Sequence, residues 1–215
     1  MNRCLVVSTI LLVLVASTAI AQEASEPEAD IYRERAGIRI GYSKATSDLD
    51  KSFGAGLNLA LHFMQRIKKP FSVDVTFGAI YLGSTEKREI FGTTYDNIAM
   101  RIITVTAAPM VEFPMNDRTN LYISAGVGLY TVSLLIDRSI EELEATDNHL
   151  GVNGGAGVFR QLSKNWFIDL NFQFHKFWTG DEHNPWKTDW VYFYSGGGKD
   201  PLFWAITGGV VLRLF

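Results

Sequence analysis

The sequence predicts an all-β chain in which eight antiparallel strands close into an up-and-down barrel that spans a membrane. Three observations lead to this fold class. Apolar and polar side chains alternate in eight segments, the links between these segments alternate in length, and no apolar run after residue 21 is long enough for a membrane-spanning helix. Alternation places successive side chains on opposite faces of a strand. Since a spanning helix needs about 20 apolar residues, insertion into a bilayer must use strands.

The first 21 residues have the features of a cleaved secretory signal peptide. Arg3 is followed by an apolar run from Cys4 to about Val15, and then by the small residues Ala19 and Ala21. A basic start, a short apolar core and an A-x-A site are typical of such signals. Cys4 is the only cysteine, so the mature chain is expected to hold no disulfide. Cleavage leaves 19 basic against 23 acidic residues, a charge of −4 that argues against nucleic acid as a partner.

Residues 22–35 are acidic and nearly free of large apolar side chains, which predicts a solvated periplasmic leader. The barrel domain is expected to cover residues 36–215. Each predicted strand is close to the 9 to 11 residues that a tilted strand needs to cross a bilayer. The predicted strands are 36–43, 53–63, 71–81, 103–113, 121–130, 150–161, 165–178 and 202–214.

The strand over residues 165–178 shows the alternation most clearly. Its apolar face carries Trp166, Ile168, Leu170, Phe172, Phe174 and Trp178. Its other face carries Phe167, Asp169, Asn171, Gln173, His175 and Phe177. Large apolar residues on one face and mostly uncharged polar residues on the other predict lipid outside and a polar lumen inside. In the strand over 53–63, the same phase places Phe53, Leu57 and Phe63 on the lipid side.

The lengths of the links give an independent test of the barrel. Short links are predicted at residues 65–70, 114–118 and 163–164. Longer links are predicted at residues 44–52, 84–96, 136–148 and 179–200. Short periplasmic turns that alternate with longer extracellular loops are typical of bacterial outer-membrane barrels. A soluble eight-stranded barrel would instead keep its outer face polar, and these apolar faces are too continuous to contact water.

The glycine-rich run 150–158, the turn 163–165 and the aromatic strand after it resemble the outer-membrane-protein β-barrel family, whose small eight-stranded members include the OmpA membrane domain and OmpX. The resemblance covers roughly residues 36–215 and implies a location in a Gram-negative outer membrane. The aromatic end at Phe215 resembles the signal that such chains present to the outer-membrane assembly machinery. The family usually has an aromatic residue two positions earlier, where this chain has Arg213.

Eight strands enclose a lumen that side chains just fill. Inward glycines are expected to make room for large lumenal rings such as Tyr122 and Tyr130. The inward charges all lie within a few residues of a periplasmic turn or chain end, and unpaired buried charges are costly. We therefore expect a lumenal ion network with a structural role, which plugs the barrel, rather than a proton path. The predicted members of this network are Arg39, His62, Asp74, Glu112, Asp169 and Arg213.

No catalytic, cofactor-binding or metal-binding residue is predicted. Some eight-stranded barrels modify lipid A as acyl hydrolases or acyltransferases, and this remains an alternative function. The tripeptide that begins at His175 lacks the serine that such a hydrolase would need. Asp181, His183 and Ser195 share the last predicted loop, but nothing in the sequence fixes the contacts that define a nucleophile and its base. A narrow porin-like channel is the second alternative.

The last predicted loop is rich in aromatic residues, which favour either a membrane-interface girdle or contact with an extracellular ligand. These candidate surface-contact residues are Trp186, Trp190, Tyr192, Phe193 and Tyr194. The sequence as a whole predicts a small, monomeric, non-enzymatic outer-membrane protein with a structural or surface-interaction role. Its expected partners are outer-membrane lipid, lipopolysaccharide, the assembly machinery and an extracellular ligand.

Overall fold

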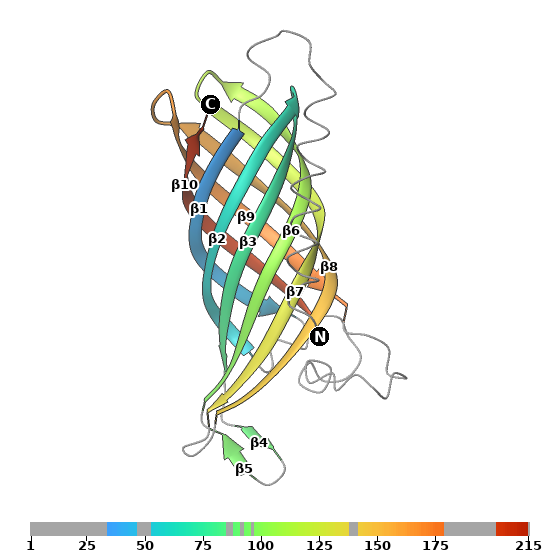
Figure 1. The fold of residues 1–215 in the computed structure, drawn as a ribbon. Coiled ribbons are helices and arrows are strands. Elements are labelled where there is room, and N and C mark those ends of the chain that lie inside the picture. Colours follow the sequence, from blue (N-terminus) through green and yellow to red (C-terminus); the bar gives the residue numbers. More distant parts are fainter. Residues whose placement is uncertain are drawn as a thin grey trace.

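A computed structural model describes residues 34–46, 53–84, 88–90, 93–95, 97–137, 142–178 and 201–214. The predicted signal peptide, most of the predicted leader and Phe215 lie outside these residues. Ten strands form in the described part (Figure 1). They are β1 (Glu34–Thr46), β2 (Phe53–Lys68), β3 (Phe71–Ser84), β4 (Arg88–Ile90), β5 (Thr93–Tyr95), β6 (Asn97–Asn116), β7 (Thr119–Asp137), β8 (Glu142–Gln161), β9 (Trp166–Phe177) and β10 (Leu202–Arg213).

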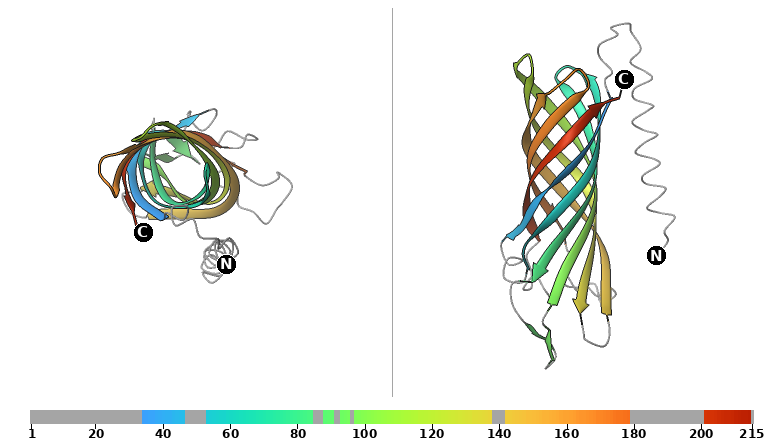
Figure 2. Two further views of the ribbon diagram at one scale, coloured as in Figure 1. Left: turned by 90° about the horizontal axis from the view of Figure 1, so that it is seen from above. Right: turned by 90° about the vertical axis from the view of Figure 1, so that its left-hand side faces the viewer.

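Eight of these strands close into one antiparallel barrel, in the order β1-β10-β9-β8-β7-β6-β3-β2. The barrel closes where β1 pairs with β10, from Arg35 opposite Arg213 to Thr46 opposite Leu202. The view along the barrel axis shows the continuous ring (Figure 2). β4 and β5 form a separate two-stranded sheet outside the ring. The predicted eight-stranded antiparallel barrel is confirmed, and its closure leaves no unpaired edge in the wall.

Both ends of the barrel sequence and the short links lie at the same end of the molecule. β1 starts at Glu34, within the range assigned to the leader, and β10 ends at Arg213. The short links occupy residues 69–70, 117–118 and 162–165. Short turns face the periplasm in barrels of the outer-membrane type. We therefore call this end, uppermost in Figure 1, the periplasmic end, and the β4–β5 sheet lies at the opposite end.

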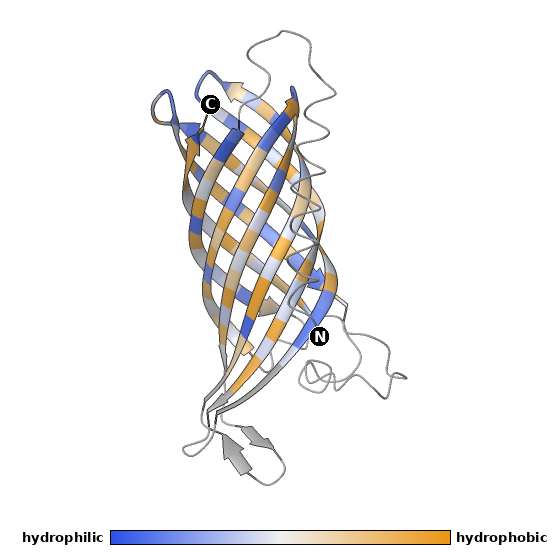
Figure 3. Cartoon of the chain, viewed as in Figure 1, coloured by the Kyte–Doolittle hydropathy of each residue, from blue (hydrophilic) through white to orange (hydrophobic). Residues whose placement is uncertain are grey.

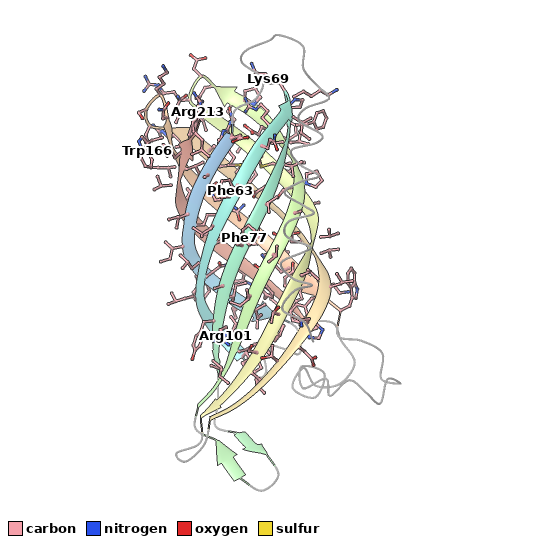
Figure 4. All side chains as sticks on the ribbon, in the orientation of Figure 1. Phe63, Lys69, Phe77, Arg101, Trp166 and Arg213 are labelled. Atoms are coloured by element: carbon pink, nitrogen blue, oxygen red, sulfur yellow. The ribbon has the colours of Figure 1, made fainter. Side chains whose placement is uncertain are left out.

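Apolar side chains cover the outside of the barrel wall, in the phase that the sequence predicts. Along β9 every second residue is exposed, from Trp166 to Phe174, and the residues between them are buried. Hydropathy alternates along the strands (Figure 3), and Phe63, Phe77 and Trp166 project outward from the wall (Figure 4). No helix among the described residues has the length and apolar character needed to cross a membrane. The apolar outer face is suited to contact lipid.

Phe53 departs from the predicted phase. It is 1% exposed and packs inside the barrel, although the alternation of the strand places it on the lipid side. The pairing of β2 with β3 shifts between Phe53 and Gly56, so one strand has an extra residue there. Because side chains alternate with a period of two, an extra residue exchanges the two faces of the strand beyond it.

Three neighbouring strands are longer than a bilayer requires. β6 and β8 have 20 residues each and β7 has 19, whereas β9 and β10 have 12 each. Most of the loop predicted at residues 136–148 is therefore strand, since β7 pairs with β8 as far as Asp137 opposite Glu142. Cross-strand hydrogen bonds support this extension, from Thr131 Oγ1 to Asn148 Oδ1 (2.7 Å) and between the hydroxyls of Ser133 and Thr146 (2.9 Å).

Candidate functional site: the barrel lumen

The periplasmic mouth of the lumen contains a group of polar side chains around the carboxylate of Glu112. Arg66 donates to Glu112 Oε2 at 2.8 Å, and Arg35 donates to the same oxygen at 3.3 Å. The Ser72 hydroxyl donates to Oε1 at 3.0 Å, and the Asn120 amide donates to Oε2 at 3.3 Å. These five residues come from β1, β2, β3, β6 and β7, so the group joins five of the eight strands. We call it the mouth cluster.

Aromatic rings pack against the arginines of the mouth. The Arg35 guanidinium lies 5.1 Å from the centre of the Phe167 ring and 5.4 Å from that of Phe159. Arg213 lies 5.1 Å from the Phe167 ring centre, on the lumenal side of β10. A guanidinium within about 6 Å of a ring face is attracted by the electron density of the ring. The rings thus help to hold two of the cations in the mouth.

Deeper in the lumen, Arg39 contacts side chains from strands on several sides of the barrel. Its Nε donates to Asp169 Oδ2, and its Nη1 lies 3.5 Å from Asp74 Oδ2. Its Nη2 donates to the Tyr122 hydroxyl at 3.4 Å. The Tyr122 hydroxyl in turn donates to Asp169 Oδ1 at 2.8 Å and accepts from the Asn171 amide at 2.8 Å. We call these five residues the Arg39 cluster.

His62 lies beside the Arg39 cluster and is fully buried. Its Nδ1 is 3.5 Å from Oδ1 of Asp74, which is long for a hydrogen bond. His62 is paired with Gly37 of β1, where an added Cβ would collide with the imidazole ring. A glycine at this position therefore leaves the space that the His62 ring fills.

The middle of the lumen is lined by smaller polar side chains. The Asn58 amide donates to the Ser43 hydroxyl at 3.1 Å, and Thr76, Thr104 and Thr106 are buried nearby on β3 and β6. The side-chain amide of Asn153 and the hydroxyl of Thr207 are also buried here and form no hydrogen bond to protein. Buried polar groups of this kind usually bind ordered water.

The half of the lumen toward the long loops is apolar, which differs from the polar lumen that the sequence predicts. Eleven buried residues form one cluster there, including Phe53, Tyr130, Phe177 and Phe203. The His175 ring stacks on Phe203, with ring centres 4.7 Å apart, and its Nδ1 lies 3.1 Å from the Tyr130 hydroxyl. An eight-stranded barrel has a lumen narrow enough for side chains to fill it, so its interior packs like a protein core. We call this group the outer apolar cluster.

The structure divides the predicted charge network into parts. Arg39, His62, Asp74 and Asp169 lie together, whereas Glu112 belongs to the mouth cluster. Arg213 is inside the barrel but stacks on Phe167. Sequence reasoning missed Arg35, which it assigned to the leader, and the lumenal role of Arg66. It placed the Tyr122 ring in the lumen but missed the contacts of its hydroxyl with Arg39 and Asp169. The signal for Arg35 is its spacing, because it lies four residues before the inward-facing Arg39 and so points to the same side of the strand.

Other predicted candidates fall outside the described residues. This applies to the aromatic surface-contact residues Trp186, Trp190, Tyr192, Phe193 and Tyr194, and to Asp181, His183 and Ser195. Within the part of the chain that the structure describes, no group of three His, Cys, Asp or Glu side chains is placed to hold a metal ion. The described histidine of the catalytic alternative, His175, packs inside the outer apolar cluster.

A closed ring of eight antiparallel strands, an apolar outer wall and a lumen lined with buried polar and aromatic side chains define a membrane-spanning β-barrel protein. The sequence profile of the family described as "Outer membrane protein beta-barrel domain" matches residues 8–194. Because the match covers most of the chain, this protein belongs to that family, and it is located in the outer membrane. No curated protein matches the sequence.

Solved structures of outer-membrane proteins share the fold at low sequence identity. A major outer membrane protein from Thermus thermophilus is 13% identical with a TM-score of 0.55, and 83% of this chain and 99% of that chain are covered. Neisserial surface protein A is 14% identical with a TM-score of 0.54, over 84% and 97%. The outer membrane protein OprG from Pseudomonas aeruginosa is 12% identical with a TM-score of 0.51, over 85% and 97%. These likenesses establish the fold.

Proposed function

We propose that this chain is a non-enzymatic outer-membrane barrel with a plugged lumen, which supports the envelope or contacts external molecules through its surface. The observation that carries the proposal is the contact between Arg39 and Tyr122. Arg39 is on β1 and Tyr122 is on β7, and these strands are four steps apart in either direction around the ring of eight. The two side chains therefore meet across the whole width of the lumen.

Two further features support closure of the lumen. The mouth cluster crosses the lumen on the periplasmic side of Arg39, because Arg35 precedes Arg39 by four residues on β1. The outer apolar cluster fills the opposite half. An ion that passes through the barrel would have to break several buried hydrogen bonds and then lose its hydration among apolar side chains, and both steps are costly. Plugging by two chemically different layers favours a structural or surface role over a channel.

The partners proposed for this role follow from where the barrel lies. The apolar outer wall contacts outer-membrane lipid, with lipopolysaccharide in the outer leaflet. The closing strand β10 leads to the aromatic residue Phe215, which the assembly machinery would recognise. An extracellular ligand would bind at the end that carries the long links. Lipid A modification remains the alternative function, and its candidate loop residues are outside the described part of the chain.

Conductance across a planar lipid bilayer tests the proposal. With the purified, folded barrel incorporated, we expect no steady ion current above that of the bare bilayer over a range of voltages. A general porin incorporated into the same bilayer is the control that detects open pores. Steady current proportional to the amount of incorporated protein would contradict a plugged lumen and favour the narrow channel.

A further inference from the structure

The periplasmic rim of the barrel carries five exposed cations next to the lipid-facing wall. They are Lys68, Lys69, Arg118, Arg160 and Lys164. Figure 4 shows Lys69 at the same end of the barrel as Trp166 and Arg213, and Arg101 toward the opposite end. Within the described residues no salt bridge joins these five cations to a carboxylate. The rim is therefore a positively charged border along an apolar surface.

Two of the cations flank a hollow at the β6–β7 turn. The hollow has a volume of about 370 Å³ and is lined by Asn116, Asp117, Arg118, Thr119 and Arg160. One water occupies about 30 Å³ in the liquid, so the hollow has room for a phosphate group together with several waters. Asp117 is its one acidic lining residue, against two arginines. The excess of positive charge suits an anion.

Backbone contacts fix the wall of this hollow. The Arg118 backbone N–H donates to the Asn116 side-chain oxygen at 3.0 Å, which holds the turn. The Gln161 backbone N–H donates to the Arg118 carbonyl oxygen at 2.7 Å, which ties the turn to the end of β8. Thr119 lies opposite Arg160 in the pairing of β7 with β8. The two arginines thus project from adjacent, hydrogen-bonded pieces of backbone.

The hollow borders the lipid-facing wall. Arg160 is paired with Ile168 on β9, and toward the membrane Leu121 on β7 is paired with Val158 on β8. Phe113 on β6 faces lipid beside Leu121 and is 47% exposed. A molecule with a phosphate in the hollow would therefore place attached apolar chains against this wall. A phospholipid has this combination of parts, whereas free phosphate has no part that uses the wall.

We propose that the hollow between Arg118 and Arg160 binds the headgroup of an anionic phospholipid in the periplasmic leaflet, with the acyl chains of the lipid against the outer face of β7 and β8. The charge of the rim selects an anionic headgroup over a zwitterionic one, because each basic residue near a membrane surface attracts anionic lipid. Arginine suits this role, since its planar guanidinium donates two parallel hydrogen bonds to phosphate.

The proposal is tested by native mass spectrometry of the folded barrel in micelles that contain equal amounts of phosphatidylglycerol and phosphatidylcholine. The wild-type barrel is expected to retain phosphatidylglycerol in preference to phosphatidylcholine. The double variant Arg118→Gln, Arg160→Gln is expected to lose this preference by about thirtyfold, from the attraction of two basic residues. The matched control Arg101→Gln, Lys176→Gln removes the same charge from the opposite end and should keep the preference.

Three outcomes would overturn the proposal. The first is equal retention of the two lipids by the wild-type barrel, a result that does not depend on any variant folding. The second is an equal loss of preference in both double variants, which would indicate a general effect of charge. The third is displacement of the retained lipid by millimolar inorganic phosphate, which would indicate a site for free anions.

Discussion

At the scale of single residues, Arg39 is the central cation of the lumen. Its side chain is 2% exposed and contacts two carboxylates and a tyrosine hydroxyl, each from a different strand. Removing an ion from water costs several kcal/mol, which the contacts offset only while all the partners are present. The loss of Arg39 would leave Asp74 and Asp169 buried without their main cation. This residue should therefore be far less tolerant of replacement than a cation at the rim of the lumen.

We predict that Arg39→Met lowers the free energy of unfolding by about 3 to 5 kcal/mol, the range for breaking a buried ion pair. The measurement is urea-induced unfolding of the barrel in detergent micelles. Arg213→Met is the matched control. Arg213 is only partly buried and stacks on Phe167, so its replacement should cost about 1 kcal/mol or less. Similar losses in the two variants would contradict the central role given to Arg39.

At the scale of elements, β8 shows how glycines shape the lumen. Gly157 faces inward and is paired with Tyr122, and an added Cβ there would collide with the phenol ring of Tyr122. Gly154 lies on the other face of the same strand, where the nearest atom to an added Cβ is the Ser124 carbonyl oxygen at 3.6 Å. The space left by Gly157 lets Tyr122 reach Arg39 and Asp169.

We predict that Gly157→Ala destabilises the barrel by about 1 to 3 kcal/mol, the usual cost of overfilling a packed interior. Gly154→Ala is a control in the same strand with the same chemical change, and its effect should be near zero. Thermal unfolding of both variants in micelles, followed by circular dichroism, makes the comparison. If both variants unfolded at the wild-type temperature, the packing of Tyr122 would not require a glycine at position 157.

The strands and their lipid faces were predictable from the sequence because a period of two is a strong local signal. The inward position of Phe53 was not, since it depends on a pairing shift between β2 and β3 that leaves no mark in the alternation. The extensions of β6, β7 and β8 were also missed, because hydroxyl and amide side chains such as Thr131 and Asn148 suit a solvated strand and a loop equally.

Several charged members of the lumenal site were predictable from the sequence, but Arg35, Arg66 and the arrangement of the site were not. Inward charges are readable from strand phase, which is how Arg39, Asp74 and Asp169 were found. Which of them meet depends on the stagger of strands around the ring, and a single sequence does not specify that stagger. This stagger places Glu112 in the mouth cluster, with Arg35 and Arg66, and apart from the other predicted charges.

At the scale of the whole molecule, the barrel is arranged in layers along its axis. From the periplasmic end these are the mouth cluster, the Arg39 cluster, a band of small polar side chains and the outer apolar cluster. The inward face of β9 passes through three of these layers at intervals of four residues. Asp169 is in the Arg39 cluster, Gln173 is in the polar band and Phe177 is in the outer apolar cluster. The polar middle band is thus enclosed between a charged layer and an apolar layer.

The most direct test of this enclosure is the reactivity of a single introduced cysteine toward a charged, membrane-impermeant thiol reagent. The only native cysteine, Cys4, lies in the predicted signal peptide, so the folded barrel offers no background thiol. Gln173→Cys places a thiol in the middle band, and Thr146→Cys places one on the exposed extension of β8. We predict that the Thr146→Cys barrel is modified within minutes, whereas Gln173→Cys reacts at least about a hundred times more slowly until urea unfolds it, as expected for a thiol shielded by a closed layer. Equal rates in the folded state would mean that the lumen is open to solvent and that the barrel is not plugged.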